Sequence, residues 1–226
     1  MKKFILIVFV FGFVNICQAQ IEKNVGDFTS LKTSNRIKVE LIPSDQNKVI
    51  VNEGQEDAVN ITNKNGRLIL KNTLKELVSE EKYSVTVQVY FNNLENIDAQ
   101  GGSYIYSQKP IQQNNLKLSV NLGSVVVLDV KTESLTATAN TGAKLTLTGT
   151  VKNSVQLKAS AGAQITANDL ITSRNKVTVN SGSIASVTAS DYLDAQVFAG
   201  GKVRIFGTPK DVKEKVTAGG IIERVK

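Results

Sequence analysis

Hydrophobic and polar residues alternate along most of the chain, and a glycine interrupts the alternation at regular intervals. In the stretch ANTGAKLTLTG, which ends at Gly149, Leu145 and Leu147 alternate with polar residues shortly after Gly142. Side chains at every second position of a β-strand share one face, so the alternation predicts strands with one buried face. Glycine weakens a strand interior, so its regular recurrence predicts a bend between two strands.

The glycine signature recurs through the second half of the chain at intervals of 18 to 22 residues. Its seven positions are Gly101, Gly123, Gly142, Gly162, Gly182, Gly200 and Gly219. A small residue follows each glycine, and the positions three and five after it are mostly apolar, as with Tyr104 and Tyr106 in the first copy. Apolar residues also precede the glycine with a period of two. These positions are predicted to face inward.

A unit of about twenty residues is too short to bury its own apolar face, whereas stacked units bury it continuously. The pattern therefore predicts an all-β fold, a parallel β-helix (solenoid) of about seven coils of roughly twenty residues. The glycines are its corners, and the small neighbours such as Ala143 prevent overpacking between coils. Asn121, Asn140 and Asn180 lie two positions before a glycine and are predicted to form a stacked amide ladder.

Residues 27–91 alternate in the same way but lack the glycine repeat. Val85 to Phe91 is the clearest strand, and Asn65-Gly66 between two alternating runs predicts a hairpin. The charged stretch 73–84 is predicted to be an excursion loop or a single helical turn. We expect residues 20–96 to form an N-terminal β capping region continuous with the solenoid, and residues 97–226 to form the repeat β-helix. Arg224 occupies an inward position, which is typical of a terminating coil.

The first residues have the pattern of a secretory signal peptide. Lys2 and Lys3 precede an apolar run over residues 4–16, and Ala19 offers a small residue before a cut. Residues 1–19 are therefore predicted to be removed, and the run is too short for a comfortable membrane span, so no transmembrane span is expected after cleavage. Cys17 is the only cysteine, so the mature chain has no disulfide and no thiol chemistry.

Charge and composition exclude several functions. Without Lys2 and Lys3, 25 basic residues stand against 20 acidic ones, which lowers the net charge from +7 to +5. These charges are spread out and lack an arginine and aromatic platform, so a solvated surface is favoured and no nucleic-acid partner is expected. The chain contains no histidine, and the regularly spaced aspartates of calcium-binding repeats are missing. No metal and no cofactor are predicted.

An enzyme on this scaffold remains the alternative, because polysaccharide lyases and hydrolases also use parallel β-helices. Glycoside hydrolysis needs two carboxylates about 5–10 Å apart. Asp129 and Asp169 lie at different distances from their glycines and do not line up, so Asp191 and Asp194 are the best candidate pair. We predict no catalytic residues, since such turn carboxylates are ordinarily solvated and the loops between coils are short.

The outward positions two and four residues after each glycine form a flat, threonine-rich face with a basic end. This candidate binding face comprises Lys144, Thr146, Gln164, Thr166, Lys202 and Arg204. A flat β-face of this kind binds a glycan or another protein in some proteins and is an ordinary solvated sheet in others.

The order of several elements resembles the bacterial head GIN domain, a family named for an auto-transporter adhesin. The elements are the opening FTSLKTSNRIKVELIPSDQNKVIVNEG, the stretch LENIDAQGGSYI with the repeats after it, and the late FGTPK. The resemblance covers residues 25–225. It implies a right-handed parallel β-helix in the cell envelope, and the family carries no established catalytic residues to transfer.

The resemblance and the residues together predict a non-enzymatic, exported protein of the Gram-negative envelope, located in the periplasm or at the cell surface. Adhesion or binding is the first expectation, with envelope glycans or surface proteins as partners. The alternatives are a β-helical polysaccharide lyase or hydrolase, and a structural or stress-response module without a ligand of its own.

Overall fold

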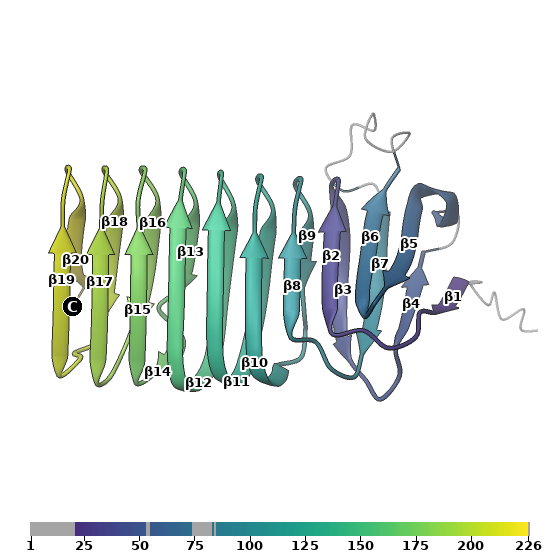
Figure 1. Cartoon of the computed structure of the whole chain (residues 1–226), viewed down its shortest axis with the longest axis horizontal. Helices are drawn as coiled ribbons and strands as arrows, with labels where there is room; N and C mark the ends of the chain where they lie inside the picture. The colour runs from purple at the N-terminus through teal and green to yellow at the C-terminus, as the bar shows by residue number, and fades with distance from the viewer. Residues whose placement is uncertain (1–20, 53–54, 74–82, 84, 226) are drawn as a thin grey trace, which may run out of the picture.

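The computed structural model describes residues 21–52, 55–73, 83 and 85–225, and its strands stack into one elongated solenoid (Figure 1). The predicted signal peptide and most of the predicted excursion at 73–84 lie outside the described residues. The all-β parallel β-helix is confirmed, because strands of successive coils pair in parallel through the whole repeat.

Each coil contributes a strand to a first sheet before its corner and a strand to a second sheet after it. The first sheet contains β6 (Arg67–Asn72), β2 (Ser30–Ser34), β8 (Asn96–Ala99), β10 (Ile111–Val120), the later parts of β11 (Val125–Asn140) and β12 (Lys144–Ser160), β15 (Arg174–Val179), β17 (Tyr192–Val197) and β19 (Asp211–Val216).

The second sheet contains β7 (Val85–Phe91), β3 (Ile37–Pro43), β9 (Tyr104–Tyr106), the earlier parts of β11 and β12, β13 (Gln164–Ala167), β16 (Ile184–Thr188), β18 (Lys202–Phe206) and β20 (Ile221–Val225). A short third side is formed where the start of β10 and the middles of β11 and β12 pair, followed by β14 (Leu170–Thr172). The core between these sides consists mainly of valine, leucine, isoleucine and alanine.

The corners are two-residue turns in which both residues have positive φ, as at Thr141 (52°) and Gly142 (69°). The amide of Ala143 donates to the carbonyl of Asn140 at 3.2 Å, which closes a type I′ turn. A Cβ built on Gly142 meets no atom within 4 Å, so this position needs glycine for its backbone conformation and not for space. Ala143 is fully buried, as its predicted role between stacked coils requires.

The same pair of left-handed residues recurs at other corners of the repeat. These pairs are Leu122–Gly123, Ala161–Gly162, Ser181–Gly182, Ala199–Gly200 and Ala218–Gly219. Together with Gly101–Gly102 and Thr141–Gly142 they make seven corners, which enclose six full turns, so the repeat has about six turns where the sequence predicted about seven coils.

The sequence alignment of the first copy was wrong by one residue. Tyr104 pairs with Val125, which places Gly102, and not Gly101, in register with Gly123. Ile105 is consequently fully buried, and Tyr104 and Tyr106, which were predicted to face inward, lie on the outer face. A shift of one residue moves every side chain of a strand to its other face. Two adjacent glycines made both alignments fit the signature.

The N-terminal region continues the stack but does not follow chain order. The β2–β3 coil pairs in parallel with β6 and β7 on one side and with β8 and β9 on the other (Figure 1). Its corner is Asn35–Arg36, with φ of 67° and 57°, so it carries no glycine.

Antiparallel strands complete the N-terminal end of the solenoid. The predicted hairpin at Asn65-Gly66 is confirmed, and it joins β5 (Val59–Lys64) to β6. β4 (Lys48–Val51) pairs antiparallel with β7, and β1 (Ile21–Asn24) pairs antiparallel with β4. A short 3-10 helix, η1 (Glu56–Ala58), precedes β5.

The last coil ends the core with an ion pair. Arg224 is in register with buried Ile205, and Glu214 is in register with buried Ala195. Their side chains meet with Arg224 Nη2 at 2.8 Å from Glu214 Oε1. The charged residues of β19 also discourage another strand from pairing with this open edge.

The amide ladder is confirmed where Asn140 Nδ2 donates to Asn121 Oδ1 at 3.0 Å. Ser160 extends it, because its hydroxyl donates to Asn140 Oδ1. Asn180 does not extend it further, since its side-chain oxygen is buried without a hydrogen-bond partner among the described residues.

Candidate functional site

The predicted binding residues lie in two straight columns on the outer face of the second sheet. Successive strands pair without a shift, so Lys144 lies beside Gln164, and Thr146 beside Thr166. One column runs Tyr104, Val125, Lys144, Gln164, Ile184 and Lys202, and the other runs Tyr106, Val127, Thr146, Thr166, Ser186 and Arg204. We call this surface the outer face. The structure thus brings all six predicted residues onto one surface, but Ile184 and Ser186 separate Lys202 and Arg204 from the other four.

The C-terminal end of the outer face, which the sequence predicted to be basic, is ion-paired. Lys202 Nζ lies 2.8 Å from Glu223 Oε1, and Arg204 Nε lies 3.3 Å from Glu223 Oε2. The hydrogen bond from Lys202 is the main cause that holds the pKa of Glu223 below its ordinary value. Glu223 lies four residues after Gly219, so the same offset count could have found it in the last copy.

The N-terminal end of the outer face carries a cluster of tyrosines, of which Tyr104 and Tyr106 were predicted from the sequence to face inward. The rings of Tyr104 and Tyr106 stack with centroids 5.4 Å apart and planes 26° apart, and Tyr83 lies 5.6 Å from Tyr104. Lys38 Nζ lies 5.5 Å from the centre of the Tyr106 ring. Tyr90 is also on the outer side of β7, where Lys48 Nζ lies 4.9 Å from its ring.

Polar side chains from neighbouring strands border the tyrosines. The Glu40 carboxylate accepts hydrogen bonds from Gln88 Nε2 at 3.2 Å and from Gln108 Nε2 at 2.6 Å. Burial, followed by the nearby Glu40 carboxylate, raises the pKa of the Tyr106 phenol above its ordinary value. A correct register for the first copy would have revealed this cluster, because Tyr104 and Tyr106 then alternate with the inward Ile105.

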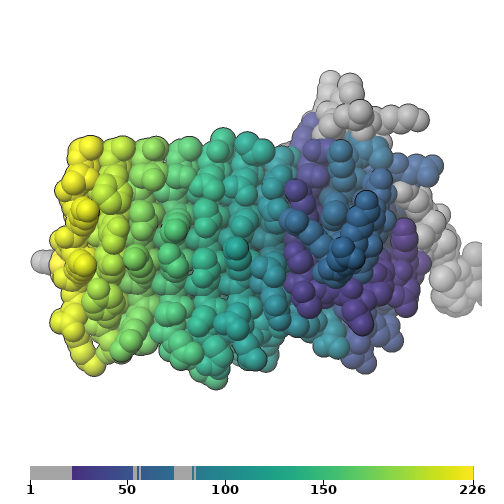
Figure 2. All heavy atoms as spheres, in the orientation of Figure 1, coloured from purple at the N-terminus to yellow at the C-terminus, as the bar shows by residue number. Residues whose placement is uncertain are grey.

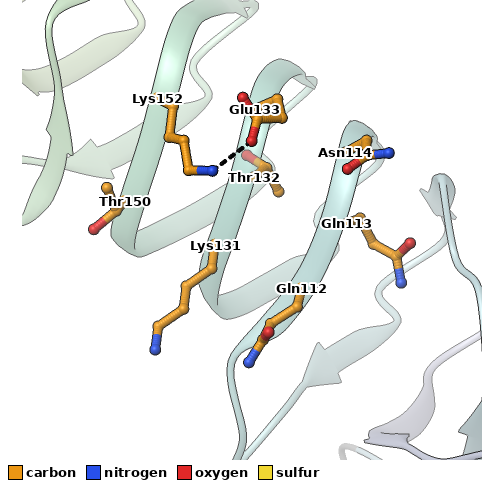
Figure 3. Close-up of a pocket in the computed structure, with 8 residues that line it drawn as sticks. All are labelled: Gln112, Gln113, Asn114, Lys131, Thr132, Glu133, Thr150 and Lys152. Atoms are coloured by element: carbon orange, nitrogen blue, oxygen red, sulfur yellow. Dashed lines mark hydrogen bonds and ion pairs between the residues drawn. The ribbon is translucent and has the colours of Figure 1, made fainter.

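A polar groove lies on the third side, where side chains from three successive coils meet (Figure 3). Its volume is about 580 Å³, and it is lined by Gln112, Gln113, Asn114, Lys131, Thr132, Glu133, Thr150 and Lys152. Lys152 Nζ lies 2.6 Å from Glu133 Oε1, and the buried Thr132 hydroxyl has no hydrogen-bond partner among the described residues. These amides, hydroxyls and ammonium groups are suited to binding a polar ligand, and no sequence motif had indicated them. In the space-filling view of Figure 2, the coils of the repeat pack side by side in chain order up to the C-terminal coil.

Asp191 and Asp194, the best candidate pair for acid–base chemistry, contact different partners. Asp191 Oδ1 lies 2.7 Å from Lys210 Nζ, and the hydrogen bond from Lys210 is the main cause that lowers the pKa of Asp191. Asp194 instead accepts hydrogen bonds from Gln196 Nε2 at 3.2 Å and lies 4.0 Å from Lys176 Nζ. In the described part of the chain, no three acidic, histidine or cysteine side chains gather to hold a metal ion.

No helix within the described residues has the length and apolar character needed to cross a membrane.

Comparisons with known proteins give a fold and a family. The chain superposes on a putative adhesin from Bacteroides fragilis NCTC 9343 with a TM-score of 0.83 and 14% identity, covering 92% of this chain and 96% of that one. A putative adhesin from Parabacteroides merdae ATCC 43184 gives a TM-score of 0.68, and a putative lipid binding protein from Parabacteroides distasonis ATCC 8503 gives 0.65, both at 18% identity and the same coverage.

No curated protein matches the chain. The sequence model described as "Putative auto-transporter adhesin, head GIN domain" matches residues 27–209, which is most of the solenoid including its N-terminal coils. The chain therefore belongs to the head GIN domain family.

Proposed function

We propose that the chain is an exported, non-enzymatic protein of the Gram-negative cell envelope that binds its partner through the outer face. The observation that carries this proposal is the unbroken register of the two outward columns from Tyr104 to Arg204. A rigid stack of paired strands holds these side chains in fixed rows, as a preorganised binding surface requires. The adhesin names of two similar structures support a binding role, although their low identity gives the fold alone.

Envelope glycans and surface proteins are the proposed partners. Lys144 and Gln164 in one column, and Thr146 and Thr166 in the other, offer hydrogen-bond donors and acceptors on two successive coils, spaced about 4.8 Å apart along the stack. Extended ligands with repeated hydroxyl or amide groups match such a row. The periplasm or the cell surface is the proposed location, consistent with the predicted signal peptide and the family.

The alternative of a polysaccharide lyase or hydrolase receives less support from the described residues. A hydrolase needs two carboxylates facing one substrate bond. Glu133 is the one carboxylate lining the groove, and Lys152 engages it. Asp191 and Asp194 are each engaged by separate basic or amide groups.

The test is a glycan and cell-surface binding array on the mature chain from Gln20. It compares the wild type with a face variant carrying Lys144→Glu, Lys202→Glu and Arg204→Glu. A matched variant with Lys117→Glu, Lys158→Glu and Lys213→Glu changes the outer side of the first sheet by the same charge.

We expect binding that the face variant loses and the matched variant keeps. Absence of binding, or equal binding by the face variant, would overturn the proposal. The same array, read for released sugar ends or unsaturated products, distinguishes an enzyme, because turnover of any glycan would contradict the non-enzymatic assignment.

A further inference from the structure

We propose that Tyr104 and Tyr106 form a stacking platform for a neutral pyranose unit of a glycan, with the hydroxyl contacts supplied by the Glu40, Gln88 and Gln108 network. This inference rests on the proposed binding function of the outer face, and it names a ligand class and a subsite for that function.

The first observation is where the aromatic residues are. The chain has five tyrosines and no tryptophan, and Tyr83, Tyr90, Tyr104 and Tyr106 all gather at the N-terminal end of the outer face. The buried aromatic side chains of the described chain are Phe28 and Phe91, so the repeat core is built without tyrosine. Tyr104 and Tyr106 are only partly buried, and the core does not need them.

The second observation is the arrangement around the platform. Both tyrosines project from the same short strand, and their rings are nearly parallel, with planes 26° apart. On the β3 side, Lys38 lies beside Tyr104, and Glu40 lies beside Tyr106. On the β11 side, Val125 lies beside Tyr104, and Val127 lies beside Tyr106. An aromatic row therefore runs between a polar row and an aliphatic row.

This arrangement matches the chemistry of a pyranose ring. Such a ring has an apolar face of C–H bonds and a rim of hydroxyl groups. The C–H bonds carry partial positive charge and favour the electron-rich faces of aromatic rings. The hydroxyls need donors and acceptors at the edge, and an immobilised network loses little entropy when it binds them.

The polar row is immobilised in this way. The Glu40 carboxylate accepts hydrogen bonds from the amide nitrogens of Gln88 and Gln108, which leaves their amide oxygens as acceptors. The Lys38 ammonium adds a donor beside the Tyr106 ring. The opposite charges of Glu40 and Lys38 offset each other beside the platform, so a sugar carboxylate finds no net positive charge there. A neutral sugar is therefore the ligand class that fits the platform.

The experiment uses the mature chain with neutral hexaoses of glucose, mannose and galactose, and with a hexamer of galacturonate as the acidic probe. Binding is followed by calorimetry and by tyrosine fluorescence, which tryptophan does not obscure because the chain has none. The test variant is Tyr104→Ala with Tyr106→Ala. The control is Tyr192→Ala, which removes a tyrosine that is 38% exposed on the first sheet.

We expect at least one neutral hexaose to bind, the double alanine variant to bind it at least about tenfold more weakly, and the Tyr192 variant to bind it unchanged. Tyr104→Phe with Tyr106→Phe keeps the ring faces and is expected to retain most of the affinity, which guards against a simple folding defect. The proposal is overturned if no neutral hexaose binds, if the double alanine variant binds as well as the wild type, or if only the galacturonate hexamer binds. Should array ligands depend on Lys144, Lys202 and Arg204 but not on the tyrosines, the binding function survives and this inference alone fails.

Discussion

Gly149 provides a severe test of how tightly the coils are stacked. It lies inside β12 with φ of 101°, at the step from the second sheet to the third side. A Cβ built on Gly149 comes closer than 3.0 Å to the carbonyl oxygen of Val130 and to Oδ1 of Asp129 in the preceding coil. Gly149→Ala therefore combines an unfavourable backbone conformation with a collision against backbone that strand pairing holds in place.

The two effects can be given magnitudes. A non-glycine residue in a sparsely populated region costs about 1–3 kcal/mol, and overpacking adds about 1–3 kcal/mol. We therefore expect Gly149→Ala to lower the free energy of unfolding by about 2–6 kcal/mol. Gly142→Ala is the matched control, because its φ is also positive but its Cβ meets nothing within 4 Å. That variant loses about 1–2 kcal/mol from conformation alone.

Urea unfolding of the two variants, followed by circular dichroism, measures the difference. A third variant, Gly142→Asn, is expected to lose less than Gly142→Ala, because asparagine tolerates the left-handed region. If Gly149→Ala costs no more than Gly142→Ala at equal m-value, the coils do not pack closely at Gly149, and the reasoning is refuted.

Three further predictions concern stacking and charge. Ala143→Leu is expected to destabilise the fold by about 1–3 kcal/mol in urea unfolding, since Ala143 is fully buried, and an unchanged midpoint would contradict its inward position. Asn140→Ala removes the donor to Asn121 and is expected to cost about 0.5–1.5 kcal/mol in the same assay; a neutral effect would show that the amide ladder adds nothing. Carboxyl NMR titration is expected to place the pKa of Glu223 below its ordinary value and to move it upward in Lys202→Ala, because Lys202 is the main cause of the shift. The ion pair stabilises the folded coil at pH values above the ordinary glutamate pKa, and this stabilisation is lost as the pH falls through the lowered pKa of Glu223. A Glu223 pKa that does not respond to Lys202→Ala would count against the ion pair.

The repeat was predictable from the sequence because its physical cause is local. A two-residue turn with positive φ at both positions favours glycine, which stands at the second position of each corner of the repeat, and burial requires a small residue after it. The inward alternation followed from these corners in the later coils, including those at Gly200 and Gly219, where a second glycine follows the corner. At Gly101–Gly102 two glycines left the register ambiguous, and the tyrosines of the first copy were assigned to the wrong face.

Other features depend on contacts that a local pattern does not contain. The β2–β3 coil turns at Asn35–Arg36, which use the left-handed region without glycine, and its position between β6–β7 and β8–β9 follows from long-range pairing. The groove collects Gln112, Lys131 and Lys152 from three coils, so it exists only after stacking. The candidate columns on the outer face were predictable from a fixed offset after each glycine, and the same offset reaches Glu223, which pairs with Lys202 and Arg204 at their basic end.

The location of the binding surface can be measured directly by lysine acetylation of the unmodified mature chain, read by mass spectrometry with and without the tightest ligand from the array. If the outer face binds, Lys144 is protected, while Lys117 and Lys158 on the first sheet acetylate at unchanged rates. Protection of Lys131 and Lys152 in the groove with Lys144 unchanged would contradict the account.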